Sequence, residues 1–153
     1  MTRDSKNRPK VDLSTQAANV PTESEEEFDT EALAMAIVEA AWEMKARNVR
    51  VLDVRGIVSY TDFIVICHGT SLRHAESIAQ FVVADLRPVK VRPLGKEGGD
   101  ESGWILVDFG DAVLHVFDEP IRADYGLESI YSDAPRYPLE PPAELEDPEA
   151  EVR

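Results

Sequence analysis

The feature that most constrains the fold is an apolar hairpin pattern at residues 103–118, which read GWILVDFGDAVLHVFD. Two strand-length runs rich in Val, Ile, Leu and Phe flank a tight Asp-Phe-Gly-Asp turn, and this pattern predicts two antiparallel strands. By alternation, the first strand has two faces, one formed by Trp104, Leu106 and Asp108 and the other by Ile105, Val107 and Phe109. Because both faces are largely apolar, we expect the hairpin to lie inside a sheet that helices cover on at least one side.

The charge balance limits the classes of partner. The chain has 153 residues and a formal net charge of −14, and this length suits one domain with a core plus tails. An acidic body repels a phosphate backbone, so direct binding to DNA or naked RNA is disfavoured. A basic protein is the electrostatically easy partner, although solubility alone explains the charge equally well.

The sequence predicts a cytoplasmic protein. It contains no apolar run of about 18 residues, so we expect no membrane span, and its polar N-terminus lacks the apolar core of a signal peptide. Its single cysteine, Cys67, cannot form an internal disulfide, which is typical of a reducing compartment.

Composition predicts three parts. Residues 1–29 are polar and acidic, and we interpret them as a disordered arm. Residues 30–134 carry the periodic apolar patterns of a folded domain. Residues 135–153 are rich in proline and acidic side chains, and their composition predicts a disordered tail.

The sequence of this domain predicts helices and strands in the order α-β-β-α-β-β-β-α. Asp29 or Thr30 caps the first helix. Gly69-Thr70-Ser71 precedes a second helix at residues 72–86, and the pattern predicts a last helix at residues 122–131. The expected strands lie at residues 49–54, 60–67 and 89–94 and in the hairpin. The fold class is therefore α/β or α+β, with a mixed sheet of about five strands flanked by helices.

Two patterns are candidates for chemistry. Gly69-Thr70-Ser71 could hold an anion at a helix N-terminus, but a simple N-cap is the favoured interpretation because the spacing is not that of a P-loop. Asp108 and Asp111 could bind Mg²⁺, but residues of this type beside a tight turn are usually turn formers. A pairing of Cys67 with His115 stays open without support. We therefore expect no enzyme, no metal and no cofactor.

Other features favour a binding module. Trp104 begins its strand directly after a Gly-rich loop, where a large ring is as suited to a partner as to a core. Charged residues of that loop, including Glu101, could form the rim of an interface beside Trp104.

The chain resembles the ribosomal silencing factors, also called Iojap-like proteins. The matching motifs together span nearly all of residues 31–131; they are KARNVRVLDVRG at 45–56, YTDFIVICHGTSLRH at 60–74, GWILVDFGDAVLHVF at 103–117 and RADYGLESIY at 122–131. Family members usually carry Trp where this chain has Tyr131, which keeps an aromatic ring at that position.

The resemblance implies a nucleotidyltransferase-like core without that superfamily's activity. It implies binding to universal large-subunit ribosomal protein fourteen, which blocks joining of the small subunit and represses translation. It implies no cofactor, and it leaves a homodimer open. The expected partner-binding residues are Trp104, Leu106, Asp108, Phe109 and Glu101. The alternative is a nucleotidyltransferase-like enzyme with a metal at Asp108 and Asp111.

Overall fold

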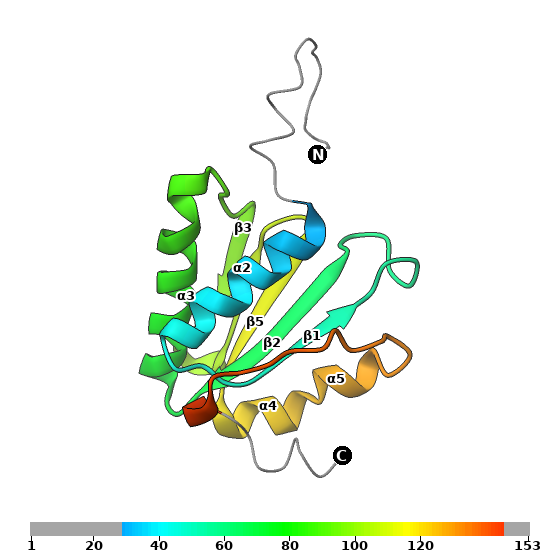
Figure 1. Cartoon of the computed structure of the whole chain (residues 1–153). Helices are drawn as coiled ribbons and strands as arrows, with labels where there is room; N and C mark the ends of the chain where they lie inside the picture. Colours follow the sequence, from blue (N-terminus) through cyan, green and yellow to red (C-terminus); the bar gives the residue numbers. More distant parts are fainter. Residues whose placement is uncertain (1–28, 146–153) are drawn as a thin grey trace.

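The computed structural model describes residues 29–145 as a mixed sheet flanked by helices (Figure 1). The helices are α2 (Thr30–Glu43), α3 (Leu72–Leu86), α4 (Glu119–Tyr125) and α5 (Leu127–Ile130), with short 3₁₀ turns η1 (Arg87–Val89), η2 (Asp100–Ser102) and η3 (Ala143–Leu145). The strands are β1 (Arg47–Asp53), β2 (Phe63–Gly69), β3 (Gly95–Gly98), β4 (Trp104–Asp108) and β5 (Ala112–Asp118). The predicted fold class is confirmed.

The sheet has the order β1-β2-β5-β4-β3, so the hairpin strand β5 lies at its centre. β2 and β5 are parallel, and the other neighbouring pairs are antiparallel. The continuous apolar run of β2 is explained by burial on both faces, because α2 and α3 contact this strand from one side and α4 from the other.

One face of the sheet, which we call the helix face, is covered by α2 and α3 (Figure 1). Asp29 caps α2 by accepting a 2.7 Å hydrogen bond from the Ala32 amide, and Ser71 caps α3 by accepting a 3.1 Å bond from the His74 amide. Both caps satisfy amides that a helix leaves unpaired in its first turn. Ile37, Ile78 and other fully buried apolar side chains fill the space between these helices and the sheet.

The opposite face is covered in part by α4 and α5, which pack over Leu52, Ile64 and Phe117. Arg122 of α4, which is 8% exposed, fixes these helices to the sheet. Its guanidinium donates to the Asn48 carbonyl at 2.7 Å and pairs with the Glu128 carboxylate at 3.0 Å. A buried guanidinium requires such partners, because an unpaired charge is costly away from water.

Several predicted boundaries are wrong. The strand predicted at residues 89–94 is replaced by β3 at Gly95–Gly98, because the ladder with β4 begins only where Gly95 pairs with Asp108. The last helix begins at Glu119 and divides at Gly126, whose φ is +57°. Pro120 lies in its first turn, where the missing amide costs nothing. β2 begins at Phe63, which leaves Tyr60 in the preceding loop.

The C-terminal segment at residues 135–145 differs from the expected solvated tail, since it lies along β1 in Figure 1. The Asp53 amide donates to the Pro135 carbonyl, and the Tyr137 amide donates to the Val51 carbonyl, both at 2.8 Å. Tyr137 also meets Phe63 edge to face, with ring centroids 5.9 Å apart. The rest of the expected tail, and the expected arm apart from Asp29, lie outside the described residues. No described helix is long and apolar enough to cross a membrane.

Candidate functional site

Strand β4 places Trp104, Leu106 and Asp108 on one face, as alternation predicts, and this is the face opposite α2 and α3. All three side chains are half-buried, whereas Ile105 and Val107 between them are at most 1% exposed. Cross-strand neighbours share a face of the sheet. Leu106 therefore lies between His115 of β5 and Glu97 of β3, its partners in the two ladders, as shown by the register.

The loop before β4 fixes the backbone of Trp104. The Trp104 carbonyl accepts hydrogen bonds from the Gly99 amide at 2.9 Å and from the Ser102 hydroxyl at 3.1 Å. Gly98 has a φ of +88°, and a Cβ there would lie 2.0 Å from the Trp104 carbonyl oxygen. Only glycine fits this approach.

A second glycine brings α4 against the start of β4. Gly103 has a φ of +71°, and a Cβ there would lie 2.6 Å from Cγ1 of Ile121. Its carbonyl also accepts a 2.9 Å hydrogen bond from the Asp118 amide, just before α4 begins. Because α4 starts this close to β4, its last residue, Tyr125, reaches the ring of Trp104.

Trp104 is the centre of an aromatic cluster. Its ring lies 5.4 Å from that of Phe117, with an angle of 19° between the planes, and 4.4 Å from that of Tyr125. Phe117 is fully buried, and Tyr125 is 45% exposed. The indole is therefore packed on one side and reaches the surface on another, an arrangement typical of anchoring residues in interfaces.

His115 completes the cluster from β5. The Trp104 Nε1–H donates a 3.0 Å hydrogen bond to His115 Nδ1, so the proton of the neutral imidazole is on Nε2. The side chain is 6% exposed, and this burial lowers its pKa to about 4 because the charged ring loses its hydration. At neutral pH the imidazole is uncharged and accepts the hydrogen bond from the indole N–H.

Asp108 acts as a turn former. Its Oδ1 accepts a 2.8 Å hydrogen bond from the Gly110 amide, and Gly110 has a φ of +91°. Among the described residues, no three His, Cys, Asp or Glu side chains are grouped as metal ligands would be. The described structure thus provides no geometric support for a Mg²⁺ site at Asp108 and Asp111.

Two tyrosines that sequence reasoning did not assign to the site contact each other, and the first of them, Tyr60, lies within the electrostatic range of Asp108. The hydroxyls of Tyr60 and Tyr131 are 2.7 Å apart, and Tyr60 is 58% exposed. Partial burial, the Tyr131 hydroxyl and the charge of Asp108 raise the pKa of Tyr60 to about 12. An aromatic residue in an exposed loop would have indicated a binding surface, but the sequence pattern predicts that Tyr60 begins a strand.

We call the surface formed by these side chains the β4 face. It consists of Tyr60, Glu97, Trp104, Leu106, Asp108, Tyr125 and Tyr131.

The remaining predicted site residues lie apart from this surface or at its edge. Phe109 is 7% exposed and packs into the core of the helix face. Glu101 is exposed in η2, directly before β4. The structure thus brings Trp104, Leu106 and Asp108 together and leaves Phe109 outside the β4 face.

The other chemical candidates have structural roles. Ser71 is an N-cap, as the favoured interpretation predicted. Cys67 packs into the core of the helix face, whereas His115 lies on the opposite face, so they form no pair. His74 bridges two segments, because its ring accepts from the Thr70 amide at 3.0 Å and its Nε2 lies 2.7 Å from the Met44 carbonyl.

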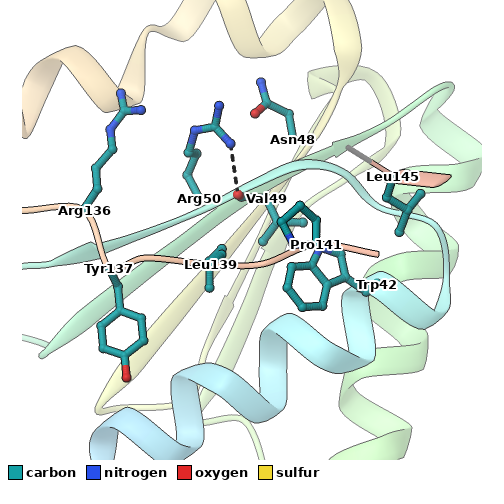
Figure 2. A pocket seen from close by; sticks show the side chains of 9 residues that line it. All are labelled: Trp42, Asn48, Val49, Arg50, Arg136, Tyr137, Leu139, Pro141 and Leu145. Carbon is teal, nitrogen blue, oxygen red and sulfur yellow. Dashed lines mark hydrogen bonds between the residues drawn. The ribbon is translucent and has the colours of Figure 1, made fainter. Parts of the chain in front are cut away.

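A pocket of about 150 Å³ lies at the other end of the sheet, between β1, the end of α2 and the C-terminal segment (Figure 2). Arg50 and Arg136 point to one side of it, and Trp42 lies on the other (Figure 2). The predicted partner-binding residues are not among those that line it. The pocket is therefore separate from the β4 face.

Comparisons with known proteins identify the family. Residues 27–153 match the family model described as "Ribosomal silencing factor during starvation". The ribosomal silencing factor of Halalkalibacterium halodurans is 38% identical over 115 residues, which cover 74% of this chain and 97% of that protein. The chloroplastic protein Iojap of Zea mays is 31% identical over 115 residues, covering 73% of this chain and 49% of that protein.

Structural similarity agrees with this result. A crystal structure of a Chromobacterium violaceum protein superposes with a TM-score of 0.66 at 25% identity, covering 75% of this chain and 92% of that one. The bacterial relatives are named as silencing factors rather than enzymes. The chain belongs to the family of ribosomal silencing factors, the Iojap-like proteins.

Proposed function

We propose that this protein binds the large ribosomal subunit through universal large-subunit ribosomal protein fourteen. Bound there, it occupies the surface at which the small subunit docks, so that joining is blocked sterically and translation is repressed. The proposal places this activity in the cytoplasm and in residues 30–134. It requires no catalytic step, metal or cofactor.

The observation that carries the proposal is the half-buried indole at the centre of the β4 face. Trp104 is held by Phe117 and Tyr125 and still reaches the surface. Tryptophan is enriched among the few residues that supply most of the binding energy of an interface, and such residues lie in well-packed surroundings. Trp104 matches this description.

The charge of the surface supports a basic partner. Glu97 and Asp108 lie on the β4 face, and Glu101 is exposed beside it. In a chain with a net charge of −14, these carboxylates favour encounter with a cationic protein surface and disfavour bare nucleic acid. A ribosomal protein that presents Lys and Arg side chains fits this surface.

The direct test is the joining of isolated subunits, followed by light scattering. Added protein should reduce the amount of joined ribosomes in proportion to its occupancy of the large subunit. Trp104→Ala should reduce this effect at equal concentration. Unchanged joining at a saturating concentration of the wild-type protein would contradict the proposal.

A binding assay with purified ribosomal protein fourteen identifies the partner. The wild-type chain should bind it more weakly as salt rises, because charge pairs at the rim of an interface are screened. Size-exclusion chromatography of the free chain tests the further expectation of a homodimer. Binding to large subunits without any affinity for protein fourteen would assign the β4 face to a different ribosomal partner.

A further inference from the structure

The indole of Trp104 is held by one specific hydrogen bond. Its Nε1–H donates to His115 Nδ1 at 3.0 Å, and the two ring planes differ by 28°. The indole N–H bond and the imidazole lone pair each lie in the plane of their own ring. Roughly parallel ring planes are compatible with this hydrogen bond.

His115 has a rigid position from which to hold the indole. It lies in the central strand β5, paired with Ile66 of β2 on one side and Leu106 of β4 on the other. Its side chain is 6% exposed, while Trp104 is half-buried. The imidazole thus lies beneath the surface, whereas the indole that it binds reaches the surface. A partner would therefore contact the indole and not the imidazole.

The hydrogen bond selects one orientation of the indole. Phe117 stacks against the ring and Tyr125 contacts it from α4, but apolar packing does not distinguish strongly between ring orientations. A donor that leaves His115 must find water or another acceptor, and this requirement penalises alternative rotamers of Trp104. Side chains locked in their bound geometry lose less freedom when a partner binds.

We propose that His115 is a positioning residue of the ribosome-binding surface. It accepts the hydrogen bond from the indole N–H and holds Trp104 in the single orientation in which the ring meets the partner. This inference rests on the proposed function, because it assigns His115 a role in that same binding event.

Two substitutions separate the hydrogen bond from the ring. His115→Phe keeps an aromatic ring on β5 and removes the acceptor. His115→Asn places its Oδ1 close to the position of Nδ1 and therefore keeps an acceptor. If His115→Phe is poorly folded, His115→Met fills a similar volume without a nitrogen acceptor and takes its place.

The first readout is spectroscopic. In ¹⁵N-labelled protein, the indole N–H resonance of Trp104 reports its hydrogen bond, and the resonance of Trp42 serves as an internal reference. His115→Phe should shift the Trp104 proton resonance upfield and speed its exchange with water. His115→Asn should retain most of the wild-type shift, and the Trp42 resonance should stay unchanged in both variants.

The second readout is co-sedimentation with purified large subunits. The affinity of His115→Phe should fall by about two- to tenfold, the typical cost of immobilising one side chain on binding, while His115→Asn recovers most of it. In a Trp104→Phe background, which lacks the indole donor, His115→Phe should have little further effect.

The outcomes distinguish the two proposals. If wild-type protein binds large subunits and folded His115→Phe binds equally well, the inference about His115 is wrong and the proposed function stands. Equal losses in the Phe and Asn variants would also overturn it, because the acceptor would then have no specific role. If the wild-type protein does not bind, the proposed function fails, and with it the role of His115 in binding, even where the resonances show the hydrogen bond.

Discussion

The helix face of the sheet is closed by α2 and α3 (Figure 1), whereas the opposite face is covered in part by α4 and α5 and has half-buried side chains along β4. Neighbouring residues of one strand show the difference, since Ile105 is 1% exposed and Leu106 is half-buried. The helix face supplies most of the core, and the β4 face presents aromatic and acidic side chains. A fold whose stability comes mainly from one face leaves the other available for binding.

The largest expected effect contrasts these two neighbours. Ile105→Ala should destabilise the protein by about 2–5 kcal/mol, because it opens a cavity in the closed core. Leu106→Ala should cost less stability, since water already reaches its side chain. Urea unfolding measures both, and equal losses would show that the two faces contribute alike to the core.

Ribosome binding by the same two variants tests the difference between the two faces further. Leu106→Ala should weaken co-sedimentation with large subunits, while the folded fraction of Ile105→Ala should bind as the wild type does. The reverse order would place the binding surface on the helix face.

A smaller effect concerns the buried histidine. Burial lowers the pKa of His115 to about 4, below its usual value of about 6.5, so the unfolded chain takes up a proton first as pH falls. The contribution of His115 to the free energy of unfolding is fully present above pH 6.5 and is lost as the pH falls towards 4. The free energy of unfolding should drop by about 2 kcal/mol between pH 7 and pH 5 relative to His115→Phe.

Urea midpoints of the two proteins at pH 5, 6 and 7 check this. Other titrating groups are common to both, so they cancel in the difference. A difference that does not change with pH would mean that His115 is solvated, and that the face beneath Trp104 is more open than described.

The smallest expected effect lies at the outer edge of the helix face. Tyr137→Leu removes the edge-to-face contact with Phe63 and should cost about 1 kcal/mol, as aromatic pairs typically do beyond the area they bury. The change lies away from Trp104, so subunit blocking should persist. Loss of blocking in the folded variant would connect the C-terminal segment to the β4 face.

Sequence reasoning succeeded where a local pattern carries the structure. The alternation of β4 predicted which side chains share a face of the sheet, and Asp29 and Ser71 predicted where two helices begin. These features depend on residues close in the chain, so the period of two and the capping side chains are sufficient to identify them.

It failed where distant residues decide. β3 is the polar run Gly95–Gly98, which forms a strand because it pairs with β4, while the more apolar residues 89–94 lie outside that ladder. Residues 135–145 have the composition of a solvated tail. Tyr137 nevertheless contacts the ring of Phe63, and Leu145 lines the pocket beside β1 and the end of α2. Tyr60 and His115 belong to the candidate site through tertiary contacts alone.

The central claim is that the indole on the open face binds the ribosome, and the two tryptophans of the chain provide its most direct test. Co-sedimentation with purified large subunits compares Trp104→Ala on the β4 face with Trp42→Ala on α2. The account predicts that Trp104→Ala weakens binding by about 2 kcal/mol or more, roughly thirtyfold, while folded Trp42→Ala binds as the wild type does. Wild-type affinity in a folded Trp104→Ala variant would contradict it.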